Sequence, residues 1–301
     1  MSLRSQVIAE KLQQGKPLLS VEFFPPKNEE GARQILRTAN RLKRYDPDFV
    51  SITYGAGGGT RERTLAYGEL LKEIFDFNVM PHLTCVGHSR DELRGIIGNF
   101  ERVGFRNIMA LRGDPPKGET EFKPHPDGLH YGSELVAFIR ENFPEFGIGV
   151  GGYPEVHPDS QDVDEDLKWL KHKVDQGADF ITTQLFFTNN DFFAWQQKLR
   201  DLGADCPIIP GILPALSAGQ LKRLTQFCKA TLPQELVEQL EACGDDDIKA
   251  RGVGVDWAYS QVKELIESGS PGVHLYIMNR HDSAETLIER LQNDGLIPKQ
   301  G

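Results

Sequence analysis

The sequence predicts a single-domain α/β fold, a (β/α)8 TIM barrel, on three observations. Short runs rich in β-branched and aromatic residues alternate along the whole chain with longer, charged segments of helical periodicity. Eight such runs occur, and 301 residues suit one large barrel. The alternative, an open doubly wound sheet, usually has fewer strands and a glycine fingerprint near its start.

The eight expected strands are short and each is followed by a helical pattern. They are Leu18–Phe24, Phe49–Tyr54, Val79–Cys85, Asn107–Arg112, Gly147–Tyr153, Phe180–Phe187, Pro207–Leu213 and Val273–Met278. Asp164–Gln176 shows the helical pattern, since Leu167, Leu170 and Val174 recur at spacings of three and four beside a polar face.

Two segments exceed the minimal spacing of a β/α unit. They are the Pro/Gly-rich stretch Asp114–Gly132 and the helical material Pro233–Asp247 before the last strand. We expect a loop and an extra helical insertion on one domain that covers residues 1–301, with no regulatory domain.

The composition excludes several classes of protein. A net charge of −10 with no run of Lys and Arg argues against a general nucleic-acid binder, although a small anion could bind through a few local cations. No apolar stretch approaches the roughly 20 residues that cross a bilayer, and the first residues lack the pattern of a secretory signal. The cysteines Cys85, Cys206, Cys228 and Cys243 form no CxxC pair. We therefore expect a cytoplasmic protein with reduced thiols and no membrane partner.

Polar residues end the expected strands. In a barrel, these strand ends meet at one mouth, where barrel enzymes place their active sites. The residues are Glu22, Thr53, Tyr54, Ala56, His82, Thr84, Arg112, Gly113, Asp114, Tyr153, His157, Thr182, Thr183, Gln184, Tyr276, Asn279 and Arg280.

Glu22 is the most informative of these residues. A carboxylate between Val21 and Phe23 loses hydration, which suits it to general acid work near neutral pH. The alternative is a Glu on an exposed edge or a structural Glu in a salt bridge. Asp114 opens a turn-rich loop and by itself reads as a turn former.

Two further patterns are weak. Gly55–Thr60 indicates close approach of the backbone to a ligand, but it has neither the P-loop ending nor the GxGxxG spacing. His82, Cys85 and His88 have the spacing of a possible metal site, yet strand alternation places His82 and Cys85 on opposite faces. We expect no metal.

Taken together, the motifs resemble those of the methylenetetrahydrofolate reductases, flavoenzymes with a (β/α)8 barrel. In order, they are Val21–Lys27, Phe49–Ala56, Pro81–Cys85, Ala110–Asp114, Tyr153–Pro158, Thr183–Gln184, Pro210–Pro214 and Leu275–Arg280. The resemblance implies reduction of 5,10-methylenetetrahydrofolate to 5-methyltetrahydrofolate in one-carbon and methionine metabolism. It also implies FAD, which takes a hydride from NADH or NADPH in a ping-pong cycle.

The resemblance also assigns roles to residues. Glu22 would protonate the folate, and Asp114 would lie near flavin and pterin. Folate contacts would come from Asp114, Gln184, Gln220, Tyr276 and Arg280, and nicotinamide contacts from Thr53, Gln184 and Leu224. Flavin contacts would come from Thr53, Tyr54, Ala56, His82, Arg112, Gly113, Asp114, Tyr131, Gly132, Tyr153, His157, Asp166 and Lys173.

This chain also departs from the family's pattern. Bacterial members can have Asn and Arg where it has Trp169 and His172, and some have Phe where it has Leu224. It also lacks the C-terminal regulatory region of eukaryotic relatives, so we expect no allosteric inhibition.

Other functions and assemblies stay open. One alternative is a catalytically altered folate- or flavin-binding partner subunit of a methyl-transfer complex. Another is a different flavin barrel oxidoreductase, such as one that acts on proline. A homo-oligomer is possible, and the sequence does not distinguish NADH from NADPH.

Overall fold

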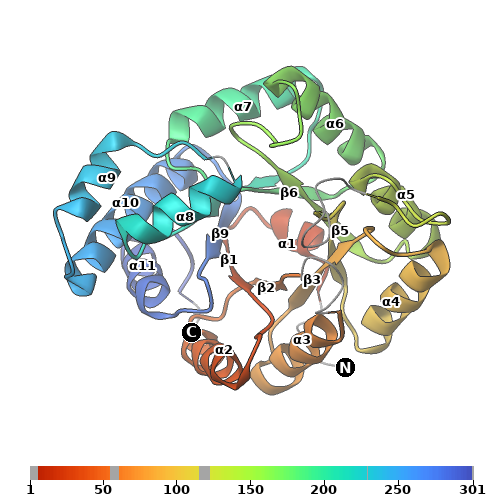
Figure 1. Cartoon of the computed structure of the whole chain (residues 1–301), viewed down its shortest axis with the longest axis horizontal. Helices are drawn as coiled ribbons and strands as arrows, with labels where there is room; N and C mark the ends of the chain where they lie inside the picture. Colours follow the sequence, from red (N-terminus) through yellow and green to blue (C-terminus); the bar gives the residue numbers. More distant parts are fainter. Residues whose placement is uncertain (1–5, 55–60, 115–122, 229, 300–301) are drawn as a thin grey trace.

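The barrel expected from the sequence is confirmed. The computed structural model describes residues 6–54, 61–114, 123–228 and 230–299, without the side chains of Arg61, Leu224, Gln226 and Phe227. Nine parallel strands form one nearly closed sheet in the order β7-β6-β5-β4-β3-β2-β1-β9-β8, with helices around it (Figure 1). The strands are β1 Leu18–Phe23, β2 Phe49–Ile52, β3 Val79–Thr84, β4 Asn107–Leu111, β5 Gly147–Gly152, β6 Phe180–Thr183, β7 Ile208–Ile209, β8 Gly211–Ile212 and β9 Gly272–Tyr276.

The expected seventh strand, Pro207–Leu213, is two strands, and the prediction of one was wrong. Pro210 separates β7 from β8 because proline has no backbone N–H for a ladder. β7 pairs with β6 and β8 pairs with β9, so the ring closes across this residue. The carbonyl of Pro210 accepts a hydrogen bond from His274 N at 2.9 Å. We call residues 208–212 the seam.

Most of the helices surround the strands on the outside of the ring, whereas the first, α1, lies within it (Figure 1). In chain order they are α1 Ile8–Leu12, α2 Glu29–Leu42, the 3-10 turn Lys43–Tyr45, α3 Arg61–Phe75, α4 Arg90–Arg102, α5 Gly132–Asn142, α6 Val163–Asp175, α7 Asn189–Asp201, α8 Ala218–Cys228, α9 Gln234–Glu241, α10 Asp247–Glu267 and α11 Asp282–Asn293. The α6 helix matches the expected Asp164–Gln176 within one residue, and α9 occupies the expected insertion. None of the helices in the described part of the chain is long and apolar enough to cross a membrane.

The core has an outer and an inner layer, as strand alternation requires. Outward side chains such as Val21, Ile52 and Leu83 pack against the helices. The inner layer lies inside the barrel and consists of Ile8, Leu12, Leu18, Phe49, Met80, Met109, Phe180 and Ile209.

The short helix α1, which the sequence analysis did not expect, fills one end of the barrel. Ile8 is completely buried in the inner layer, and its backbone N–H donates to Asn107 Oδ1 at 2.8 Å. Asn107 Nδ2 donates to Gln6 O at 3.0 Å. The carboxyl ends of the strands lie at the other end, where they form the mouth.

Candidate active site

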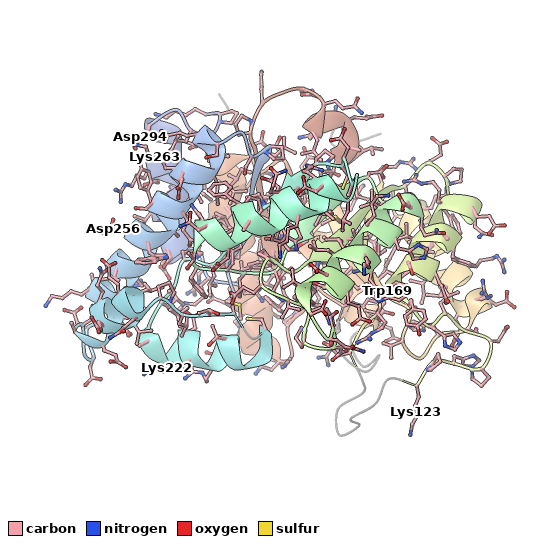
Figure 2. All side chains as sticks on the ribbon, turned by 90° about the horizontal axis from the view of Figure 1, so that it is seen from above. Lys123, Trp169, Lys222, Asp256, Lys263 and Asp294 are labelled. Atoms are coloured by element: carbon pink, nitrogen blue, oxygen red, sulfur yellow. The ribbon has the colours of Figure 1, made fainter. Side chains whose placement is uncertain are left out.

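The mouth of the barrel contains two adjoining hollows that together hold most of the expected site. The larger, about 480 Å³, is the acid lobe; its lining includes Glu22, Thr53, His82, Asp114, Tyr153, Thr182, Gln184, Cys228, His274, Tyr276 and Met278. The smaller, about 190 Å³, is the cation lobe; its lining includes Tyr54, Thr84, Arg112, Gly113, Asp114, Gly132, Tyr153, His157 and Lys173. Asp114 and Tyr153 belong to both lobes. Figure 2 shows Lys222 of α8 and Lys123 toward the lower edge of the view, with Trp169 farther from that edge.

Glu22 is 7% exposed and lies among polar side chains from neighbouring strands. Its Oε2 is 3.5 Å from Ser51 Oγ, 3.5 Å from His82 Nε2 and 3.9 Å from His274 Nε2. The parallel register explains this arrangement, because Glu22 pairs with Ser51 on one side and with Tyr276 on the other. The strand pairing therefore brings the carboxyl group into the acid lobe.

Hydrogen bonds fix the proton of His274. Ser20 Oγ donates to Val273 O at 3.1 Å, so it accepts from His274 Nδ1 at 2.8 Å. The Nε2 atom on the other side of the ring lies 3.3 Å from Ser51 Oγ and 3.9 Å from Glu22 Oε2. His274 is 1% exposed, so the ring is held rigidly between Ser20 and Ser51.

Two ionisable groups beside Glu22, His82 and Tyr276, are neutral at pH 7. Burial lowers the pKa of His82 to about 4, and the nearby Glu22 charge offsets only part of this effect. Burial raises the pKa of Tyr276 well above its usual range, and its hydroxyl donates to Thr183 O at 2.6 Å. Such surroundings suit a carboxyl group that exchanges a proton with a bound molecule rather than one held in an ion pair.

The cation lobe brings two positive side chains together. Arg112 pairs with Asp159, and Lys173 Nζ donates to Gly151 O at 3.4 Å. Burial lowers the pKa of Lys173, although Asp166 opposes the shift. Gly113 has φ +91°, and a Cβ there would lie 2.7 Å from Val86 Cγ1, so the backbone requires glycine. The lobe can bind an anionic group against Arg112 and Lys173.

Two predicted flavin residues lie beside the lobes rather than in their lining. Asp166 Oδ2 accepts from His157 N at 3.2 Å, and burial raises the pKa of its carboxyl group. Tyr131 is 57% exposed and stacks on Trp169, with ring centroids 6.3 Å apart and planes 8° apart. Trp169 also contacts His172 edge-on.

The predicted folate residues Gln220 and Arg280 line a separate recess of about 10 Å³ beside Tyr276. Gln220 Oε1 accepts from Leu216 N at 2.8 Å at the start of α8. Ala56 lies outside the described residues, and so does the side chain of Leu224.

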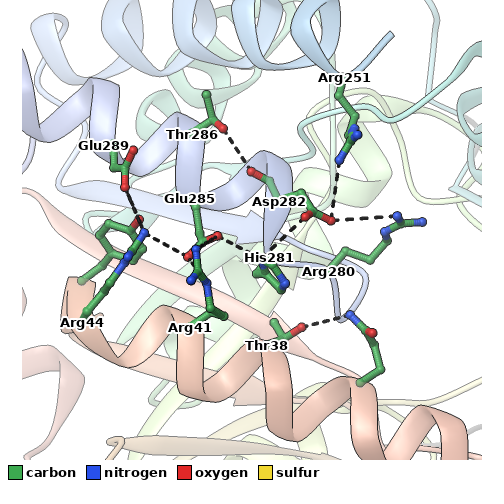
Figure 3. A network of polar contacts seen from close by, with 12 residues as sticks. Thr38, Arg41, Arg44, Arg251, Arg280, His281, Asp282, Glu285, Thr286 and Glu289 are labelled. Carbon is green, nitrogen blue, oxygen red and sulfur yellow. Dashed lines mark hydrogen bonds and ion pairs between the residues drawn. The ribbon is translucent and has the colours of Figure 1, made fainter. Parts of the chain in front are cut away.

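Arg280 belongs to a network of charged side chains at the rim (Figure 3). It lies 3.9 Å from Asp282 and its side chain is 54% exposed. Arg41 holds Glu285 through two hydrogen bonds of 2.9 and 3.0 Å, and His281 adds a third at 2.9 Å. Burial raises the pKa of Glu285, but these hydrogen bonds outweigh it and the pKa is lowered. The network anchors α11 to α2 and places Arg280 beside the mouth.

Several residues of the site were not expected from the sequence. Ser51 and His274 lie beside Glu22, Ser20 bonds His274, and Met278 lines the acid lobe. A signal was present, because Ser20 and Glu22 are two residues apart on a buried strand and share a face. Asn279 was expected at the mouth as a strand-end residue. With φ 55° it turns the chain after β9, its Oδ1 accepts from Phe24 N at 2.9 Å, and its Nδ2 donates to Phe24 O at 2.8 Å.

The expected separation of His82 and Cys85 is confirmed. His82 faces the acid lobe, whereas Cys85 packs in the outer core and its Sγ donates to Arg112 O at 3.3 Å. Within the described ranges, no group of three His, Cys, Asp or Glu side chains could hold a metal.

Comparison with known proteins identifies the family. The profile of methylenetetrahydrofolate reductase matches residues 7–292. The chain belongs to the methylenetetrahydrofolate reductase family. The 5,10-methylenetetrahydrofolate reductase of Escherichia coli is 36% identical over 278 residues, which cover 92% of each chain.

A plant relative and a solved structure extend the comparison. Methylenetetrahydrofolate reductase (NADH) 1 of Arabidopsis thaliana is 37% identical over 295 residues, or 95% of this chain and 49% of that one. This chain therefore spans about half the length of that relative. A Clostridium thermocellum protein described as binding two copies of 5-methyl-5,6,7,8-tetrahydrofolic acid shares the fold, with a TM-score of 0.65 at 17% identity over 96% of this chain and 99% of that one.

Proposed function

We propose that this protein is a flavin-dependent reductase that converts 5,10-methylenetetrahydrofolate to 5-methyltetrahydrofolate with NADH or NADPH. Membership of the family supports this reaction, and the E. coli relative matches over nearly its whole length. The observation that carries the proposal is Glu22, a buried carboxyl group at the mouth. Its ionisable neighbours His82 and Tyr276 are neutral at pH 7.

The described residues fit a flavin dinucleotide. Arg112 and Lys173 would hold its pyrophosphate in the cation lobe, close to His157 and Tyr153. Within the described part of the chain, the buried atoms His82 Nε2, Thr84 Oγ1 and Thr182 Oγ1 have no hydrogen-bond partner, so polar partners from a ligand suit them. When bound, FAD would accept a hydride from the nicotinamide nucleotide and supply it to the folate.

The protein's own residues would prepare the folate for reduction. Glu22 would donate a proton to the folate so that its five-membered ring opens to an electrophilic iminium. Asp114, which lines both lobes, would favour that positive charge. Gln184 would orient folate and nicotinamide in turn, since its side chain lines the same lobe as Glu22. Residues 1–301 would act as one catalytic domain.

Anaerobic spectroscopy tests this function. We expect purified protein to be yellow, to be bleached by NADH or NADPH, and to regain its colour with methylenetetrahydrofolate. Reduction with each nucleotide in turn would also identify the preferred donor. Colourless protein that FAD does not reconstitute would contradict the proposal and favour a non-reductase partner subunit.

The variant Glu22→Gln tests the role of the acid. We expect reduction of the flavin by the nucleotide to continue at close to its normal rate, whereas folate turnover falls by about 10²- to 10⁴-fold because the proton donor is lost. Glu30→Gln is the matched control, since Glu30 is exposed on α2. Equal losses in both half-reactions would assign Glu22 a structural role.

A further inference from the structure

A carboxylate on one side of the mouth is hydrogen bonded to a segment on the other side. Glu155 lies in the loop after β5, and Thr231 lies between α8 and α9. Thr231 N donates to both carboxylate oxygens at 2.9 Å, and Thr231 Oγ1 donates to Oε2. We call these three bonds the Glu155 clasp.

The clasp joins the walls of the two lobes. Glu155 stands between Tyr153, which lines both lobes, and His157, which lines the cation lobe. Thr231 lies three residues after Cys228, the last residue of α8, which lines the acid lobe with Glu22. Burial raises the pKa of the Cys228 thiol, and the charge of Glu155 adds to this effect, as expected for two groups that lie close together.

Helix α8 borders the mouth, because Cys228 at its C-terminal end lines the acid lobe. The Glu155 clasp lies just beyond this end of the helix. Figure 1 shows α8 in front of α10 on one side of the barrel, with one end close to β9. At its N-terminal end, Gln220 bonds Leu216 N and borders the recess with Arg280 and Tyr276. Movement of residue 231 would therefore shift the helix that borders the acid lobe.

We propose that Glu155 is a positioning residue that clasps Thr231, holds α8 beside the acid lobe and so controls access to it. The proposal deepens the proposed function, because an acid lobe that takes nucleotide and folate in turn must open between them. Glu155 is only partly buried and Thr231 is exposed. Hydrogen bonds in such a setting are weak enough to break in each cycle.

Alkylation of Cys228 measures opening of the clasp without any turnover. The holoprotein would be treated with N-ethylmaleimide, and labelling at each cysteine would be followed by mass spectrometry. Cys243 is the internal reference, because it is also partly buried and bonds Gln239 O on α9. The buried Cys85 and Cys206 report any general unfolding.

Three variants separate the clasp from other effects. Glu155→Gln removes the charge and turns an amide NH₂ toward Thr231, so we expect the ratio of Cys228 to Cys243 labelling to rise about tenfold. Thr231→Val removes one hydrogen bond and keeps the carboxylate, and we expect the ratio of Cys228 to Cys243 labelling to rise about threefold. Because Glu155 keeps its charge in this variant, such a rise cannot come from a change in charge beside the Cys228 thiol. Thr231→Ser keeps all three bonds and should match the unaltered protein. Glu235→Gln, on the exposed face of α9, is the charge control.

Steady-state kinetics add a second measurement. We expect Glu155→Gln to change KM for methylenetetrahydrofolate by about three- to tenfold, with a smaller change in kcat. An unchanged labelling ratio in both Glu155→Gln and Thr231→Val would overturn the proposal, as would Thr231→Ser behaving like Thr231→Val. Failure of the proposed function would appear as absent flavin chemistry, and the labelling ratios would still be measurable.

Discussion

The neutral, buried His82 makes the stability of the protein depend on pH. Its side chain is 12% exposed, and burial lowers its pKa from 6.5 to about 4. Between these values the unfolded chain binds a proton at His82 and the folded protein does not. Stability therefore rises with pH across this window, by about 1.4 kcal/mol for each pH unit.

The sign and size of the effect follow from these two values. The contribution of His82 is fully present above pH 6.5 and is lost as the pH falls to about 4. The difference of about 2.5 pH units corresponds to a loss of about 3 kcal/mol, which is a large part of the stability of a typical domain.

Urea unfolding of the unaltered protein and of His82→Asn, between about pH 7.5 and pH 4.5, measures this contribution. We expect the variant to lose less stability on acidification, so the two curves approach each other by about 2 to 3 kcal/mol. His130→Asn is the control, because His130 is exposed. A difference between His82→Asn and the unaltered protein that stays constant within about 0.5 kcal/mol over this range would refute the reasoning.

Two further predictions concern stability. Asn107→Ala should lower the free energy of unfolding measured in urea by about 2–4 kcal/mol, because Ile8 N would be buried without a partner. The control Asn99→Ala, on an exposed part of α4, should change this free energy by less than about 0.5 kcal/mol. Equal effects of the two substitutions would contradict the role of Asn107. Gly211→Ala should lower the stability measured by thermal unfolding by at least about 2 kcal/mol, because the new Cβ would lie 2.3 Å from Thr183 O. Gly98→Ala has open space around its Cβ and should stabilise α4 by about 0.5–1 kcal/mol.

Much of the fold could be predicted because strand alternation and helical periodicity are local signals. Seven of the eight expected strands match the observed strands within a few residues. The largest difference is at Phe180–Phe187, because the observed strand β6 already ends at Thr183. The side chains of Phe186 and Phe187 continue the apolar pattern past the strand because they pack in the core. The break at Pro210 was visible in the sequence, but a ring that closes across a proline is a tertiary property.

The candidate site was predicted in part for a similar reason. Glu22, Asp114, Gln184 and Tyr276 line one lobe because strand ends converge in a barrel. The neighbours Ser51 and His274 could not be assigned, since their contact with Glu22 depends on the register between β1, β2 and β9. The Glu155 clasp spans 76 residues, and no local pattern marks it.

The seam also has a consequence for how the chain folds during synthesis. The first strand pairs with β9, and Ser20 bonds Val273 across a separation of 253 residues. Until the ribosome has released β9, β1 and β7 both expose unpaired strand edges, and such edges pair readily with other chains. The pairing of β9 with β1 and with the two-residue strand β8 then completes the ring last, against a high loop-closure cost. Slow translation before residue 272 would therefore prolong the state in which nascent chains associate with one another.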